Sequence, residues 1–491
     1  MVFSTPIFLF YFLTLTLLVY YLVPRRLRNP VLLCASLLFY FWGERVYTVI
    51  MLLSTAIDYT HGMLVERCKA RGNDRGARMA VASSMVFNLG LLFFFKYWDF
   101  LAGSLQAVGL GFMPALNIHL PIGISFYTFQ TMSYTIDVYR GDARAQRSIV
   151  NFGTFVTLFP QLIAGPILKY KDLGDQIDQR DCTAEKFASG VQIFMVGMGK
   201  KVLLANNVGL LWERYKALPL DQLTVAGAWL GVIAFTFQIY FDFSGYSDMA
   251  TGLGRMLGFE FAPNFRYPYI SRSITEFWRR WHISLSSWFR EYLYIPLGGN
   301  RCSKPRWMLN LFLVWAATGI WHGASWNYLL WGLYFFVLLM LEKLFLLSRL
   351  EKAPRVLQFF ALLMLEKRFL LARLEQAPRV LQHLYTMFLV VVSWAIFAIE
   401  DFSQLRAYLA VMFGLGGAPL ADGVFGYYLR SYLPVLCAAA LASTPLGVSL
   451  FQKLGSRTRQ ILCTLLVLAG LVLCTAYLVD GTYNPFLYFR F

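Results

Sequence analysis

Charged residues are scarce in this sequence. They make up 14% of the 491 residues, whereas hydrophobic residues make up 58%. A soluble domain usually carries roughly 25% charge, so a soluble globule is excluded and we expect an all-α, multi-pass integral membrane protein. The formal net charge of +17 then indicates basic loops held against an anionic lipid leaflet, and not a nucleic-acid partner.

Signatures of metals and cofactors are also missing. The seven cysteines are scattered, without a CxxC pair and without a Cys/His metal spacing, so neither a disulfide framework nor a zinc site is indicated. The sequence has no Walker loop, no dinucleotide fingerprint and no GxSxG elbow. We therefore expect no bound metal or cofactor.

Long apolar runs dominate the chain instead. The first, Ile7 to Val23, is long enough to cross a hydrocarbon core of about 30 Å. Its charges follow it, in residues 24–28, whereas a cleavable signal peptide carries charges before its apolar run. The positive-inside rule puts this basic loop and the next, residues 66–78, in the cytoplasm. Extended along the chain, this rule puts both termini outside, and the lengths predict roughly eleven to fourteen apolar helices in one domain, residues 1–491.

Two apolar stretches carry features that are costly in a membrane. Phe152 to Ile167 contains Pro160, Gly165 and Pro166, which predict a broken or re-entrant segment buried in protein or lining a cavity. Asp242 and Asp248 lie in an apolar, aromatic stretch. Buried acids need partners, so we expect them to cap a helix end or to pair with arginines of the following loop, unless they serve a site.

The stretch from Glu276 to Trp331 holds two histidines in different settings. Between Arg255 and Arg306 there are nine Lys and Arg against three Glu, which predicts a cytoplasmic location. Tryptophans beside arginines in this region favour amphipathic helices in the membrane interface. The tryptophans are Trp278, Trp281 and Trp288, and the arginines are Arg279, Arg280 and Arg290. His282 is expected on that surface, either to contact a substrate or simply to hold a helix there.

His322 lies in the second setting, between two strongly apolar segments, Leu309 to Trp321 and Trp326 to Leu347. An out-and-back path predicts that it sits at a turn between two helices, at depth or near the outer face of the membrane. A histidine at such a place is either a hydrogen-bonded packing residue or a functional one.

A tandem duplication follows. Residues 335–358 and 359–382 are identical at 20 of 24 positions. Two copies do not make a solenoid, which needs at least three repeats. An inserted copy is readily accommodated as extra interfacial helix, rich in Leu with Lys and Arg, and we assign it no function.

Five stretches together resemble the membrane-bound O-acyltransferase family, and most of all its bacterial polysaccharide branch, typified by the membrane subunit of alginate O-acetylation. These stretches are Pro121 to Tyr127, Leu158 to Pro166, Tyr240 to Ala250, Ile274 to Arg301 and Trp321 to Trp331. Together they span nearly the whole chain apart from the duplication, and each alone would be weak. The resemblance implies a helical bundle with broken and interfacial helices around a central cavity.

The resemblance also implies site residues. The family's histidine in a Trp-His-Gly context matches His322, and a second histidine in an Arg-Trp-His context matches His282. Acyl transfer from a thioester to a hydroxyl needs a base, and neutral imidazole suits that role at neutral pH. Residues proposed to contact the donor or substrate complete the candidate site: Arg279, Arg280, Trp281, Trp321, Asn327, Asp242 and Asp248. The arginines suit a phosphate-bearing donor but equally suit a lipid-facing position.

The activity implied is O-acetyl transfer at the bacterial inner membrane. The donor would be a cytoplasmic acyl thioester such as acetyl-CoA, and a periplasmic SGNH-like partner would pass the acetyl group to a polysaccharide beside its synthesis and export machinery. Alginate, cellulose and peptidoglycan are open as acceptors, and transfer at His322 is either direct or a relay. Outside this class, a secondary transporter also has broken helices and intramembrane acids, and a scaffold of an export complex is the third interpretation.

Overall fold

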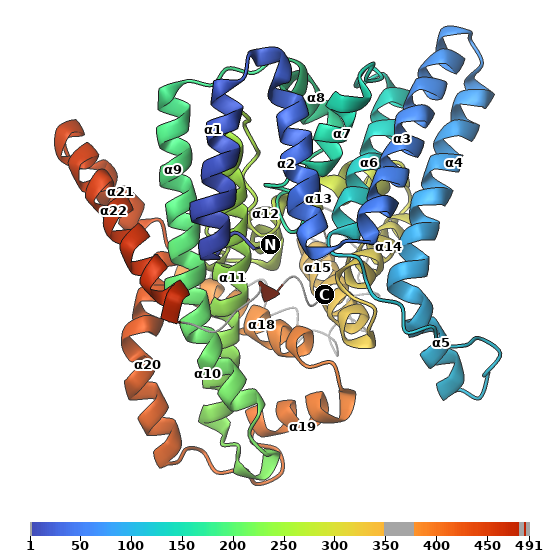
Figure 1. The fold of residues 1–491 in the computed structure, drawn as a ribbon. Helices are drawn as coiled ribbons and strands as arrows, with labels where there is room; N and C mark the ends of the chain where they lie inside the picture. The colour runs from blue at the N-terminus through green and yellow to red at the C-terminus, as the bar shows by residue number, and fades with distance from the viewer. Residues whose placement is uncertain (1, 348–377, 481–485, 488–491) are drawn as a thin grey trace. The chain divides into compact units, whose positions relative to one another are not determined.

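The computed structural model describes residues 2–347, 378–480, 486 and 487, and this part of the chain is helical and contains no strand (Figure 1). The second copy of the duplication and the junction between the copies lie mostly outside the described residues. Two compact units can be distinguished: residues 1–203, 240–263 and 456–491 form the first, and residues 204–239 and 264–455 form the second. That the whole chain acts as one domain stays a prediction.

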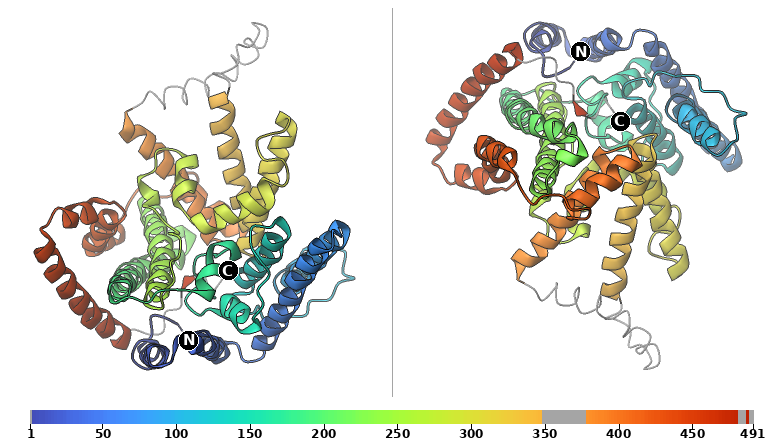
Figure 2. Two further views of the ribbon diagram at one scale, coloured as in Figure 1. Left: turned by 90° about the horizontal axis from the view of Figure 1, so that it is seen from above. Right: turned by 90° about the horizontal axis from the view of Figure 1, so that it is seen from below.

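The first unit holds both long apolar helices and shorter ones. They are η1 and α1 (Ile7–Leu13, Thr14–Leu22), α2 (Arg28–Gly43), α3 (Tyr47–Ala70), α4 (Asp74–Leu92), α5 (Trp98–Ala107), α6 (Ile124–Arg140), α7 (Ile149–Thr157), α8 (Tyr170–Asp178), α9 (Ala184–Gly199) and α22 (Ser456–Asp480). The antiparallel neighbours α3 and α4, both blue, lie side by side in each view of Figure 2.

The second unit holds α10 (Asn206–Lys216), α12 (Ile274–Arg280), α13 (Ile283–Phe289), α14 (Lys304–His322), α15 (Trp326–Leu347), α18 (Arg379–Ala398), α19 (Phe402–Met412), α20 (Gly423–Ala442) and α21 (Leu446–Gln452). Helix α11 (Val225–Met256) begins in this unit and ends in the first. It therefore continues through the apolar, aromatic stretch of Asp242 and Asp248 before it ends at Met256.

Among the described residues, seven helices are long and apolar enough to cross a membrane: Tyr47–Ala70, Asp74–Ala107, Ala184–Lys216, Val225–Met256, Arg379–Ala398, Gly423–Ala442 and Ser456–Asp480. Ile7–Leu22 is a shorter apolar helix. A multi-pass membrane protein is thus confirmed, with fewer such helices than expected. Some apolar runs, such as those in α2 and α6, form helices of only 16 and 17 residues.

The broken segment is confirmed. Helix α7 ends at Thr157, and the chain then turns through Pro160, Gly165 and Pro166 without regular structure until α8 begins at Tyr170. Residues 152–168 are buried throughout. Non-helical backbone is tolerated in a membrane protein when protein covers it, and here the first unit covers it.

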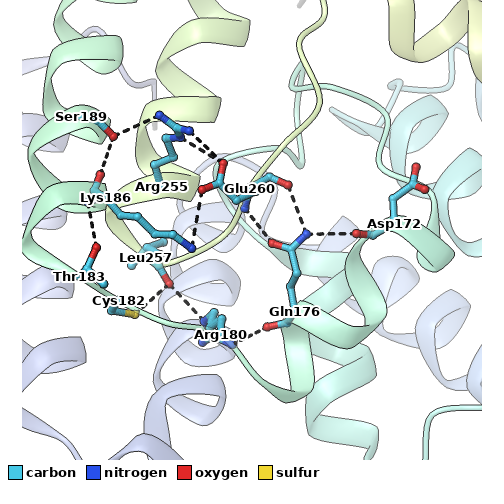
Figure 3. Close-up of polar contacts among 10 residues, drawn as sticks. All are labelled: Asp172, Gln176, Arg180, Cys182, Thr183, Lys186, Ser189, Arg255, Leu257 and Glu260. Carbon is cyan, nitrogen blue, oxygen red and sulfur yellow. Dashed lines mark hydrogen bonds and ion pairs between the residues drawn. The ribbon is translucent and has the colours of Figure 1, made fainter.

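Charged and polar side chains connect α8 and α9 to the end of α11 in the first unit (Figure 3). Glu260 pairs with Arg255 at 3.1 Å and with Lys186 at 3.7 Å, and its backbone N–H donates to Gln176. Arg180 donates to the carbonyl of Leu257. These contacts tie the chain just after α11 to α8 and α9.

Candidate active site

His322 is the last residue of α14, and its position follows from how α14 packs against α15. A Cβ atom on Gly319 would lie 2.4 Å from the carbonyl oxygen of Tyr328, and one on Gly332 would lie 2.4 Å from that of Trp315. Only glycine permits such an approach, so the two helices pack backbone to backbone. The chain turns at residues 323–325 and re-enters a helix at Trp326, as the sequence predicts.

Aromatic rings surround the His322 imidazole. Its centroid lies 5.0 Å from the ring of Trp331, 5.1 Å from that of Trp321 and 5.5 Å from that of Phe397. His322 is 5% exposed. Three helices, α14, α15 and α18, thus contribute to a largely water-free setting for the imidazole.

Asn327 fixes the third of these helices. Its side-chain amide donates to the carbonyls of Ile396 and Phe397, at 3.3 and 3.0 Å, where α18 ends. These carbonyls have no intrahelical partner. Asn327 therefore holds the end of α18, and with it Phe397, beside the start of α15, whereas the sequence suggested a substrate contact.

His282 lies between α12 and α13 and is fully buried, at 0% exposure. The expectation of an exposed, interfacial histidine is wrong. Its ring lies 5.9 Å from that of Trp321, the residue whose indole also contacts His322. The structure therefore brings together the two histidines that the charge pattern separated.

Burial and the nearby His322 together hold the pKa of His282 well below its ordinary value. Desolvation is the larger cause, because a charged imidazolium loses its hydration in this setting. His282 is consequently a neutral imidazole at neutral pH, able to accept a proton or a hydrogen bond through one ring nitrogen.

The expected interfacial tryptophans are buried as well, which corrects a second prediction. Trp278 packs against Trp315 and Phe335, with centroids 4.7 and 4.9 Å apart, and Trp281 packs against Trp394 at 4.9 Å. Tryptophan beside arginine is typical of a membrane interface, but the same rings also pack well against other aromatic rings. Among the residues around α12 that we proposed for the site, only the arginines reach the surface.

Arg279 is exposed, and Arg280 is half-buried. Arg280 pairs with Glu276 at 2.9 Å and donates to the carbonyl of Arg266. Arg280 thus serves the local structure, whereas the exposed Arg279 fits either a donor contact or a lipid contact.

Asp242 and Asp248 belong to the first unit and lie within α11, since that helix continues to Met256. Asp242 pairs with Lys201 at 2.5 Å, and Asp248 pairs with Lys200 at 2.6 Å. The expected helix cap and the expected arginine partners are therefore wrong. Both lysines come from the π-helical turn Lys200–Ala205, and they lie 48 and 41 residues before their partners. The sequence does not reveal how such a turn rotates the side chains that follow it.

Sequence reasoning missed two residues that contact His282. Asn264 Oδ1 lies 3.2 Å from His282 Nδ1, and Ser284 Oγ donates to that same Oδ1. Asn264 lies outside the five stretches of the family resemblance, and Ser284 lies inside one of them, Ile274 to Arg301, but was not singled out. In the described residues, no group of three or more His, Cys, Asp or Glu side chains is arranged to hold a metal ion.

Comparison with known proteins identifies the family. The sequence pattern of the membrane-bound O-acyltransferase family matches residues 140–350, which include both histidines. A relative from Azotobacter vinelandii, named "Probable alginate O-acetylase AlgI", is 43% identical over 86% of this chain and 80% of its own length. A relative of the same name from Pseudomonas putida is 38% identical over the full length of both chains.

A third relative is named for a different acceptor. The "Peptidoglycan O-acetyltransferase" of Helicobacter pylori is 33% identical over 68% of this chain and 68% of its own length. The family and the transfer of an acyl group are thus common to relatives with different acceptors. The chain belongs to the membrane-bound O-acyltransferase family and is a membrane O-acyltransferase.

Proposed function

We propose that this protein moves an acetyl group from a cytoplasmic thioester, acetyl-CoA, across the bacterial inner membrane toward an exopolysaccharide such as alginate. The observation that carries this proposal is the aromatic setting that His282 and His322 share through Trp321, inside the segment that matches the family pattern. The names of the relatives from Azotobacter vinelandii and Pseudomonas putida favour alginate as the acceptor.

His322 is the base in this proposal. Its imidazole accepts the proton of an acceptor hydroxyl as the hydroxyl oxygen attacks the thioester carbonyl. A carbon–oxygen bond forms and the carbon–sulfur bond breaks, and the leaving thiolate takes the proton back from the imidazolium. The surrounding rings of Trp321, Trp331 and Phe397 exclude water, which otherwise would hydrolyse the thioester.

The acceptor hydroxyl belongs either to the polymer itself or to an SGNH-like periplasmic partner that relays the acetyl group. In this proposal the basic loops face the cytoplasm, where they attract an anionic donor, and both termini face the periplasm. Polysaccharide synthesis and export proteins are the expected neighbours in the membrane.

Reconstituted vesicles test this proposal. Protein of known orientation is supplied with acetyl-labelled CoA on one side and with alginate or peptidoglycan fragments on the other, with and without the periplasmic partner. The proposal predicts base-labile acetyl ester on alginate, with donor consumed only from the cytoplasmic face. Ester on peptidoglycan alone would overturn alginate as the acceptor and would give this protein the acceptor for which the Helicobacter pylori relative is named. Consumption of donor from the periplasmic face would overturn the proposed direction.

A further inference from the structure

Asn264 makes an unusual number of contacts to one short stretch of chain. Its Oδ1 atom lies 3.2 Å from His282 Nδ1, 3.2 Å from the backbone nitrogen of Ser284 and 3.0 Å from Ser284 Oγ. Its backbone carbonyl accepts the N–H of Ile283 at 2.9 Å. Asn264 is itself 3% exposed, so these contacts are shielded from water.

The orientation of the Asn264 amide follows from Ser284. A backbone N–H can only donate, so the atom that faces it must be the amide oxygen and not the amide nitrogen. That oxygen also faces His282 Nδ1, and an amide oxygen can only accept. His282 Nδ1 therefore carries the proton of this hydrogen bond.

Ser284 Oγ supports the same assignment. It lies 3.5 Å from His282 Nδ1, and its own proton is donated to Asn264 Oδ1. Ser284 Oγ therefore faces the His282 ring with a lone pair and not with its proton. Both oxygen atoms beside Nδ1 act as acceptors, so a neutral His282 has its proton on Nδ1 and its lone pair on Nε2.

The backbone of His282 is held in a conformation that it would not adopt by itself. Its φ and ψ are 44° and 54°, in the left-handed region, which is strained for a residue with a side chain. The N–H groups of Ile283 and Arg266 donate to the carbonyls of Asn264 and Arg280, at 2.9 and 3.0 Å. These two bonds tie the Asn264 loop to the strained turn, and strained backbone of this kind gathers at functional sites.

We propose that Asn264 is a positioning residue that fixes His282 as the tautomer protonated on Nδ1, so that Nε2 is the atom of His282 that accepts a hydrogen bond or a proton. The inference deepens the proposed function, because it gives the second histidine one defined atom for acyl transfer. It parallels the general rule that the partner of one ring nitrogen sets the chemistry of the other. Burial of His282, which keeps the imidazole neutral, supports it.

Two substitutions separate this role from simple capping of α13. Asn264→Asp keeps an acceptor oxygen in place, whereas Asn264→Leu keeps much of the volume and removes the acceptor. Asn310→Leu is the matched control, because Asn310 is also a buried amide of the second unit, is 0% exposed, and donates to the carbonyls of Leu297 and Gly299 without contacting a histidine.

The first measurement is histidine NMR on the full-length protein with isotope-labelled imidazoles, which reports the tautomer directly. The chain has five histidines, and His282→Asn identifies the signal of His282. We expect an Nδ1-protonated ring in the wild type, in Asn264→Asp and in Asn310→Leu, and a mixture of tautomers in Asn264→Leu. An Nε2-protonated ring in the wild type would overturn the proposal, whether or not the protein transfers acetyl groups.

The second measurement is the rate of acyl transfer by the same variants. The partner that orients a metal-binding imidazole through its other ring nitrogen is worth about 10–100-fold. By analogy we expect kcat to fall by about that factor in Asn264→Leu and by less than about tenfold in Asn264→Asp. If Asn264→Leu and Asn310→Leu lose the same activity and the same thermal stability, Asn264 is a helix cap and the positioning role is wrong.

His282→Asn separates the two ring nitrogens, because the asparagine amide stands in for Nδ1–H but has nothing at the position of Nε2. We expect this variant to fold and to lose activity. Wild-type activity in folded His282→Asn would show that His282 serves only its hydrogen bond to Asn264, and would overturn the proposal. An inactive wild type with the expected tautomer would instead contradict the proposed function alone.

Discussion

The indole of Trp321 lies 5.9 Å from the imidazole of His282, between ring centroids, and the same indole contacts the His322 ring at 5.1 Å. One buried side chain thus touches both histidines of the candidate site. This arrangement predicts that the two histidines are sensitive to the same substitution.

Trp321→Phe keeps an aromatic ring between the histidines, and Trp321→Ala removes it. We expect Trp321→Ala to lower kcat/KM by about 100-fold, because small displacements of reacting groups have effects of this size, and Trp321→Phe to lower it much less. Steady-state acyl transfer by both variants gives the comparison. Equal rates for the two variants would show that the indole does not position the histidines.

Glu342 provides a test of how α12 is held. This buried carboxylate of α15 accepts the N–H groups of Ile274 and Thr275, at 2.7 and 2.9 Å, and also the hydroxyl of Thr275. Because hydrogen bonds to a charged group contribute about 1.5–3 kcal/mol, we expect Glu342→Ala to lower the unfolding temperature clearly. The exposed Glu185 is the control, and Glu185→Ala should leave it nearly unchanged. Similar shifts for both would rule out the capping role.

The two lysine–aspartate pairs of the first unit differ in burial. Lys201 and Asp242 are 2% and 3% exposed, whereas Lys200 and Asp248 are 22% and 32% exposed. Breaking a buried pair leaves an uncompensated charge and costs about 3–5 kcal/mol, whereas an exposed pair contributes about 0–1 kcal/mol. We therefore expect Lys201→Met to destabilise the protein far more than Lys200→Met.

A double-mutant cycle sharpens this prediction. The pair Lys201→Met with Asp242→Asn removes both charges, so it should destabilise less than the sum of the single changes. Denaturant unfolding in detergent measures all four proteins. Additive effects at Lys201 and Asp242 would mean that the pair is not coupled.

The lowered pKa of His282 predicts a dependence of stability on pH. The unfolded chain binds a proton near the ordinary value of 6.5, and the folded protein does so only at a much lower pH. Below about pH 6.5 the unfolded state therefore binds more protons, and stability falls with falling pH. His282→Asn lacks this proton, so its unfolding temperature should fall less than that of the wild type between about pH 7.5 and about pH 5.5. Parallel curves for the two proteins would contradict the buried neutral imidazole.

The fold was largely accessible from the sequence, because apolar length and basic loops are local signals. The helix pair around His322 was predicted from apolar length, and the break at Pro160 from the helix-breaking residues of its stretch. The pairing partners of the buried acids could not be predicted from the sequence. Lys201 pairs with Asp242 from within a π-helical turn, and such a turn leaves no clear trace in composition.

His282 shows the same limit at the candidate site. Arginines and tryptophans beside it predicted a membrane surface, yet Trp281 and Trp278 pack inward on Trp394 and Trp315. The charge pattern reports which side of the membrane a loop faces, and it does not report which side chains the loop buries. Asn264, 18 residues before His282, gave no signal because its role depends on a tertiary contact.

The central claim is that His322 is the base of acyl transfer, and purified His322→Ala in vesicles with acetyl-labelled CoA and the acceptor tests it most directly. His61→Ala is the control, since His61 lies on α3 in the other unit. A general base contributes about 10²–10⁴-fold, so transfer should fall by at least about 100-fold in His322→Ala and stay near wild type in His61→Ala. Transfer at the wild-type rate by folded His322→Ala would contradict the proposed mechanism.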